Sequence, residues 1–293
     1  MKVLIKQICI TIASLLRVLR YSRITDNFLK LAVIEDTCFV LGNGPSLNMD
    51  LEKCKNLHCL GNAWCVNDFA NTVLYESIQP KNYVFADPAY WMDGVSEKLN
   101  VSREQLFQNI QNKTTWQLVI YAPYDAKGFF EKKFPHASKF TLFFYNNVPV
   151  IGAKNIINWL YDKGLGMPFV QNVLVAALFL VLRRGHKKIV ILGADHSWHE
   201  TLALDDNNRV CLRDKHFYET DAKLVPFTND LQQQTTFTMP QIFFALARMF
   251  EGYWCAKEFS EYVGAEIYNA SSVTYIDAFK RIDSSIFFNH HSN

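Results

Sequence analysis

Short apolar runs alternate with amphipathic stretches along most of this chain. Each run holds Val, Ile, Leu or aromatic residues and closes at a turn signal, as expected for buried strands. We predict strands at 37–42, 58–61, 82–86, 115–121, 188–193 and 265–268, and helices at 171–184 and 240–263. This alternation predicts a single doubly wound α/β domain with a mostly parallel sheet, in which ligands bind beyond the carboxyl ends of the strands.

The first 34 residues have the pattern of an amphipathic helix instead. Six aliphatic residues gather on one side of a helical wheel, opposite basic residues: Leu4, Ile8, Ile12, Leu15, Leu16 and Leu19. The uncharged stretch 7–16 is too short to span a bilayer, and the arginines that follow it do not fit a signal peptide. Two interpretations stay open: a helix lying in the headgroup plane of a membrane, or a helix packed on the domain.

The remainder, 35–293, is predicted to form the α/β domain. From His196 to about residue 239 the apolar periodicity fades, and charged, Asn and Asp residues dominate. Such a profile predicts a long lid-like insertion within the domain.

Composition and charge narrow the classes of partner. With 49% hydrophobic residues the chain can bury a sizeable core, and a net charge of +2 disfavours nucleic acid as the main partner. Residues 1–30 carry six Lys or Arg against one Asp, so positive charge gathers on the amphipathic helix. The seven cysteines include no Cys-x-x-Cys pair, which fits a reducing compartment and no zinc knuckle.

The loop 42–47 reads Gly-Asn-Gly-Pro-Ser-Leu, follows the first predicted strand and opens a helix. Free N–H groups at a helix start favour phosphate. The loop lacks the third glycine of a dinucleotide fingerprint and the Gly-Lys-Ser/Thr of a Walker loop, so we expect neither of those sites. A phosphate contact and a merely tight turn both stay open.

Polar side chains follow three further predicted strands, at Asn62, Asp87 and Asp195. Because polar residues at successive strand ends of one sheet converge on one crevice, their recurrence predicts a site there. Taken singly, each is equally explained as a residue that caps a turn.

Histidines gather after the strand at 188–193. The segment 195–200 reads Asp-His-Ser-Trp-His-Glu, and His216 follows it. Imidazole suits the deprotonation of a hydroxyl near neutral pH. His196 and His199 could instead bind a divalent metal with a neighbouring carboxylate, but no further ligand set is evident, and we expect no metal site.

At this point the motifs carry a family resemblance. Residues 39–47, Phe-Val-Leu-Gly-Asn-Gly-Pro-Ser-Leu, resemble the opening motif of the bacterial lipooligosaccharide sialyltransferases. Further matches follow in the same order at 61–62, 84–88, the helix–Gly185–strand block ending at 193–195, 215–218 and 267–272, and cover about half the chain. The resemblance implies a Rossmann-like, GT-A-type fold and inverting, metal-independent transfer from a CMP-sugar donor to a cell-surface glycan or glycolipid. The donor is a substrate, and no cofactor is implied.

The resemblance also assigns roles to residues. His216 is the implied general base that takes the proton of the acceptor hydroxyl. The implied donor site comprises Asn43 and Ser46 near the nucleotide phosphate and ribose, Asn62 and Asp87 near the cytidine, Asn172 near the donor, and Asn269 and Ser271 as supports of the nucleotide. Gly44, in the loop, and Asp195, at a strand end, are further candidates for the donor site.

The chain departs from the family at two places. The family has asparagine where Asp87 stands, and it uses tyrosine hydroxyls against the departing phosphate where this chain has Ser197, Trp198 and His199. We expect His199 or Trp198 to donate to the phosphate instead. The donor sugar therefore stays open between sialic acid, Kdo and a sugar on another nucleotide.

Two other families share the Gly-x-Gly-Pro-Ser-Leu opening: the flagellin-modifying glycosyltransferase-like proteins and the pterin diphosphokinase-like enzymes. The second would need Mg²⁺ held by carboxylates such as Asp87 and Asp195. For the sialyltransferase-like alternative we expect a cytoplasmic enzyme, peripheral on the inner face of the bacterial inner membrane through residues 1–34. A monomer and a homo-oligomer both stay open.

Overall fold

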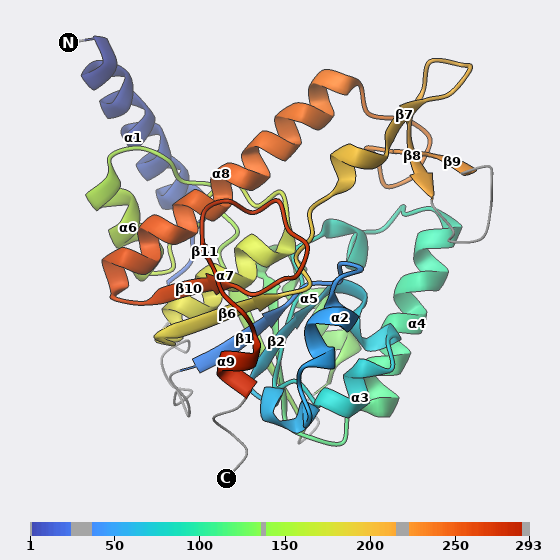
Figure 1. Ribbon diagram of the computed structural model, residues 1–293. Coiled ribbons are helices and arrows are strands. Elements are labelled where there is room, and N and C mark those ends of the chain that lie inside the picture. Colours follow the sequence, from blue (N-terminus) through green and yellow to red (C-terminus); the bar gives the residue numbers. More distant parts are fainter. Residues whose placement is uncertain (1, 25–36, 136–138, 215–222, 289–293) are drawn as a thin grey trace.

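One parallel sheet organises the protein (Figure 1). The computed structural model describes residues 2–24, 37–135, 139–214 and 223–288. Within these ranges eight strands follow the order β11-β10-β6-β1-β2-β3-β4-β5, and every neighbouring pair is parallel. The strands are β1 (Thr37–Leu41), β2 (Ala63–Val66), β3 (Asn82–Val84), β4 (Leu118–Pro123), β5 (Phe140–Tyr145), β6 (Lys188–Leu192), β10 (Glu266–Asn269) and β11 (Lys280–Arg281).

Helices cover both faces of the sheet, as the sequence predicts. Neighbouring residues of β1 enter two separate cores: Val40 packs in one with the residues of α7, and Phe39 packs in the other with those of α4. Side chains buried on both faces are the rule for parallel sheets, and the doubly wound, Rossmann-like fold is confirmed. The helices are α2 (Leu47–Glu52), α3 (Leu74–Ile78), α4 (Glu97–Lys113) and α5 (Lys127–Lys133) on one side, α6 (Lys154–Asp162), α7 (Val173–Arg183) and α8 (Met239–Val263) on the other, and α9 (Ser285–Phe288) near the C-terminus.

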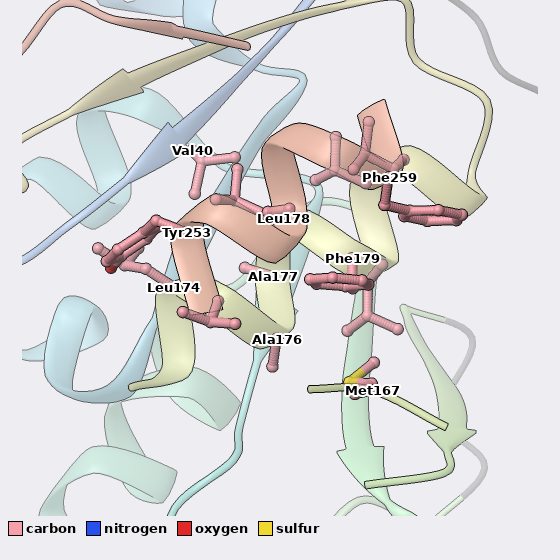
Figure 2. Close-up of a cluster of buried hydrophobic side chains, with 14 of the residues drawn as sticks. Val40, Met167, Leu174, Ala176, Ala177, Leu178, Phe179, Tyr253 and Phe259 are labelled. Atoms are coloured by element: carbon pink, nitrogen blue, oxygen red, sulfur yellow. The ribbon is translucent and has the colours of Figure 1, made fainter. Parts of the chain in front are cut away.

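Helix α7 forms the centre of the first core (Figure 2). It is buried between the sheet and α8, so its residues are apolar on all sides, from Val173 to Leu182. Phe179 of α7 stacks on Phe259 of α8 with ring centroids 5.3 Å apart. This packing fixes α7 against the sheet, and with it the direction of its N-terminus.

Three strands of the parallel sheet, β2, β5 and β11, differ from the prediction. Residues 58–61 are not a strand, because Leu57–Leu60 form a 3-10 helix (η2) that Asn56 caps, and the second strand is Ala63–Val66. The edge strands β5 and β11 were not predicted: the residues of β5 are mostly half-buried, and β11 has only two residues, both exposed. Short strands depend on their partners in the sheet more than on their own composition.

The polar segment 196–239 has more structure than the predicted loop. Its described residues, 196–214 and 223–239, include a 3-10 helix, η6 (Trp198–Thr201), and the strands β7 (Leu202–Leu204), β8 (Val210–Asp214) and β9 (Lys223–Pro226). These strands form a separate antiparallel sheet. Figure 1 shows this small sheet beyond the N-terminal end of α8, away from α1.

The N-terminal segment is helical, as predicted, over α1 (Lys2–Tyr21). Its second half lies against the body of the protein, whereas Figure 1 shows its first turns extending away from the body. Among the described residues, no helix is long and apolar enough to cross a membrane.

Candidate active site

A polar crevice opens at the carboxyl ends of β1, β2 and β6. Strand β1 is followed by β2 on one side of the sheet and paired with β6 on the other, so the chain winds outward in opposite directions from this point. Ligands of doubly wound proteins bind at such a topological switch point. The crevice has a volume of about 180 Å³, and its polar lining includes Asn43, Asn67, Asn172, Asp195, His196, Ser197 and Trp198.

The loop after β1 lies directly against the loop after β6. Gly44 donates its N–H to the carbonyl of Gly193 at 2.9 Å, and a Cβ on Gly44 would lie 2.2 Å from Oδ1 of Asp195. A Cβ on Gly42 would lie 2.2 Å from the same carbonyl of Gly193. Close approach of two loops therefore requires these glycines, which is the tight-turn interpretation of the motif.

Two buried carboxyl groups fasten the two loops together. The hydroxyl of Ser46 donates to Oδ1 of Asp195 at 2.5 Å, and the N–H of Ser46 donates to Oδ2 at 3.2 Å. Asp50, at the start of α2, accepts from the N–H of Gly193 and from the N–H of Ser272, both at 2.7 Å. Hydrogen bonds to buried charged groups are among the stronger ones, so this wall of the crevice is preorganised.

A C-terminal segment supports the same wall from behind. The hydroxyl of Ser271 accepts from the N–H of Ala194 at 3.0 Å, and that of Thr274 donates to the carbonyl of Ala194 at 2.8 Å. Tyr275 donates its N–H to the carbonyl of Asp195 at 3.0 Å. Asn269 accepts from the N–H of Ser271 and keeps the segment bent.

Two asparagines lie at the ends of neighbouring strands in the crevice. Asn43 donates from Nδ2 to the carbonyl of Val66 at 3.0 Å. Asn67 follows β2 in a left-handed backbone conformation (φ 48°), and its buried Oδ1 has no hydrogen-bond partner among the described residues. A buried acceptor without a partner costs about 1–3 kcal/mol, so a ligand that donates a hydrogen bond to it gains affinity.

The N-terminus of α7 forms a third wall. Asn172 caps this helix, because its Oδ1 accepts from the N–H of Leu174 at 2.7 Å, and residues 172–174 line the crevice. The positive end of the dipole of an 11-residue helix therefore points at the cavity. An anionic group of a ligand is stabilised at that position.

The fourth wall holds a buried histidine. His196 has a left-handed backbone (φ 55°), stacks on Trp198 with centroids 5.0 Å apart, and shares a hydrogen bond with the hydroxyl of Tyr253 on α8. Burial lowers the pKa of His196 to about 4. The imidazole is therefore neutral at pH 7, and strained backbone at both Asn67 and His196 is typical of functional sites.

Two carboxyl groups lie near one another at the ends of β2 and β3. Asp68 is exposed as a residue, but the protein removes part of the water around its carboxyl group, which raises its pKa. The hydrogen bond with Tyr90 lowers this pKa, and the negative charge of Asp87 raises it further. Asp87 caps the 3-10 helix η4 (Pro88–Tyr90) by accepting from the N–H of Ala89 at 2.9 Å. Among the described residues, no group of three or more His, Cys, Asp or Glu side chains could hold a metal ion.

The structure gathers part of the predicted site. Asn43, Gly44, Asn172 and Asp195 line the crevice together. Ser46, Asn269 and Ser271 are fully buried, and they hold the loops that form the walls. Asp87 is exposed, caps η4 and is not among the residues that line the crevice.

Asn62 lies elsewhere. It precedes β2 instead of following a strand, and it donates to the carbonyl of Thr37 at the amino end of β1. The expectation that it meets the other strand-end residues was wrong, because the strand it was thought to follow is a 3-10 helix.

The two predicted catalytic histidines have different outcomes. His199 lies in η6, one residue beyond Trp198, and packs edge-on against the ring of Tyr275 with centroids 4.3 Å apart. His216 lies outside the described residues. Asn67 was missed as a site residue, and the apolar run Ala-Trp-Cys-Val before it is the signal that could have located it.

No protein-family model matches the chain, and no curated protein matches it. Among solved structures, it is similar to the MAf glycosyltransferase from Magnetospirillum magneticum AMB-1, with a TM-score of 0.47 and 12% sequence identity. The similarity covers 96% of this chain and 38% of that one, so this chain spans well under half the length of that protein.

Proposed function

We propose that the crevice binds the nucleotide of a sugar donor and that the protein is a glycosyltransferase. The observation that carries the proposal is the position of the crevice: it lies at the switch point of the sheet, between the loop of residues 42–46 and the N-terminus of α7. The resemblance of residues 39–47 to the sialyltransferase motif supports CMP as the nucleotide.

The walls suit the parts of a nucleotide. The α7 N-terminus and the amide of Asn43 offer positive potential and donors to a phosphate. Asn67 offers a free acceptor, which an amino or hydroxyl group of the base or ribose can satisfy. Trp198 lines the cavity with 40% of its surface exposed, and one face of its ring is stacked on His196.

The proposed reaction is a direct displacement at the anomeric carbon of the donor. The acceptor oxygen forms the new bond as the phosphate departs, and a general base takes the hydroxyl proton. His216 is our candidate for this base, and His199 is our candidate donor to the departing phosphate. We propose transfer to a glycan or glycolipid, with sialic acid or Kdo as the sugar.

A thermal-shift screen against CMP, CDP, UDP, GDP, ADP and ATP, with and without Mg²⁺, tests the proposal. We expect CMP to raise the melting temperature without metal, because a ligand that binds the native state stabilises it. A response to ATP that needs Mg²⁺ would contradict it and favour a diphosphokinase-like enzyme.

Two asparagine variants locate the binding site. Asn67→Ala should weaken CMP binding about tenfold, the effect of losing one hydrogen bond of roughly 1.4 kcal/mol. Asn62→Ala, at the other edge of the sheet, is the matched control and should leave the Kd unchanged. Equal Kd values for CMP in the two variants would show that CMP does not bind in the crevice.

The base has its own test. His216→Ala should lose most turnover with CMP-sialic acid or CMP-Kdo while it retains CMP binding. Unchanged turnover would reject His216 without affecting the assignment of the nucleotide site.

A further inference from the structure

Helix α1 binds the body of the protein through a polar edge. The hydroxyl of Thr11 accepts from the N–H of Ala153 at 2.8 Å, and the hydroxyl of Ser14 donates to the carbonyl of Ile151 at 2.7 Å. Gly152 permits this contact, since a Cβ there would lie 2.3 Å from Oγ1 of Thr11. Only small polar residues and Val18 are fully buried on the helix.

The apolar side of α1 is consequently left open. We define the apolar stripe as Ile5, Ile8, Ile12, Leu16 and Leu19, whose spacing places them along one side of the helix. Leu16 and Leu19 are 61% and 82% exposed, whereas Leu15, on the same predicted face, packs against the core. Monomeric proteins rarely expose a continuous apolar surface of this kind without a partner for it.

Basic residues accompany the stripe. Lys2, Lys6, Arg17 and Arg20 follow one another along the side of the helix next to the stripe, and the helix contains no acidic residue. Lys2 and Lys6 are exposed, and they lie on the first turns, which extend away from the body (Figure 1). An apolar stripe beside a row of cations matches the interior and the anionic surface of a bilayer.

We propose that α1 is a docking helix for an anionic membrane surface. The apolar stripe enters the boundary between headgroups and acyl chains. The exposed cations Lys2, Lys6 and Arg20 contact lipid phosphates. Arg17 instead donates to the carbonyl of Pro149 at 2.7 Å and holds the helix on the body. Charge favours this occupant over a second copy of the chain, because an anionic surface has the complementary charge, whereas an antiparallel pairing of two stripes would bring two rows of like charges together. The proposal does not depend on the nucleotide site.

Vesicle co-sedimentation tests the proposal with the full chain. The protein should sediment with vesicles that contain phosphatidylglycerol and should stay in solution with phosphatidylcholine alone. The double variant Ile12→Gln/Leu16→Gln should lose this binding. The matched control, Val73→Gln/Val101→Gln, changes two exposed apolar residues away from α1, of which Val101 is 64% exposed, and should bind as the unmodified chain does.

The charged part of the surface has a separate prediction. Lys2→Gln/Lys6→Gln should weaken partition into anionic vesicles on the order of 30-fold, from about 1 kcal/mol for each cation near the surface. Added salt should weaken the binding of the unmodified chain in the same direction. An equal response to neutral and anionic vesicles would refute the electrostatic part.

The oligomeric state completes the test. Sedimentation velocity without lipid should give the same mass for the unmodified chain and for Ile12→Gln/Leu16→Gln. A dimer that dissociates in this variant, together with no vesicle binding, would show that a second copy covers the stripe and would overturn the proposal. Circular dichroism of each variant verifies that it is folded, and CMP binding should persist in all of them.

Discussion

A methyl group added at Gly44 tests the close contact between the loops after β1 and β6. In Gly44→Ala, the new Cβ would lie 2.2 Å from Oδ1 of Asp195 and 2.6 Å from the carbonyl oxygen of Gly193. The carbonyl belongs to the backbone, so it cannot rotate away. Asp195 must therefore move by about 1 Å to reach an ordinary contact distance, which breaks its hydrogen bonds from Ser46.

The cost of this movement follows from the contacts. The hydrogen bond from the Ser46 hydroxyl to Asp195, 2.5 Å long, is made to a buried carboxyl group, and its loss costs about 1.5–3 kcal/mol. Overpacking of the site adds about 1–3 kcal/mol. The free energy of unfolding should therefore fall by about 2.5–6 kcal/mol, the sum of the two.

Urea unfolding, followed by circular dichroism, measures the change, and Gly128→Ala is the matched control. Gly128 lies in α5, where a Cβ would meet nothing within 4 Å. Alanine there should stabilise the protein by about 0.5–1 kcal/mol, because it lowers the backbone entropy lost on folding. The reasoning fails if both variants shift stability in the same direction, or if Gly44→Ala is as stable as the unmodified chain.

Three further outcomes are expected. Burial lowers the pKa of His196 to about 4 from an ordinary 6.5, so between these values the unfolded chain binds one proton more than the folded one, and the free energy of unfolding falls as the pH drops. Urea unfolding should show a loss of about 2 kcal/mol between pH 7 and 5. His196→Asn, which suits the left-handed backbone at this position, should remove that loss. Gly152→Ala should release α1, and limited trypsin digestion should then cut faster after Arg17; an unchanged rate contradicts the contact with Thr11. CMP should quench the fluorescence of Trp198, and Trp198→Phe should abolish that change; a quench that persists would place CMP elsewhere.

Most of the fold could be predicted from the sequence because its strands are buried on both faces. A run such as Lys-Ile-Val-Ile-Leu at 188–192 has no interpretation as a surface segment, and β6 follows the prediction closely. The helix at 239–263 likewise has clear ends, a capping box at Thr238 and a left-handed Gly264. Strand β2 was displaced because the apolar residues of η2 precede it and resemble a strand.

The site was harder to predict than the fold. A sequence shows that a residue follows a strand, but it does not show whether the side chain of that residue already forms a hydrogen bond within the protein. Ser46 is an example: its position in the motif suggested a ligand contact, whereas its hydroxyl donates to Asp195, which lies far along the chain. Asn67 is the opposite case, because only the packed structure reveals that its Oδ1 has no partner among the described residues.

The support of Ala194 and Asp195 by Ser271, Thr274 and Tyr275 has a consequence for biosynthesis. The polypeptide leaves the ribosome from its N-terminus, so the loop at Asn43 emerges long before the segment that completes the wall behind it. At roughly 5–20 residues per second, an interval of roughly 10–50 s separates the two. During this time the nascent chain holds polar backbone groups of the future crevice without their final partners. The crevice can therefore take its final form only after nearly the whole chain has been synthesised.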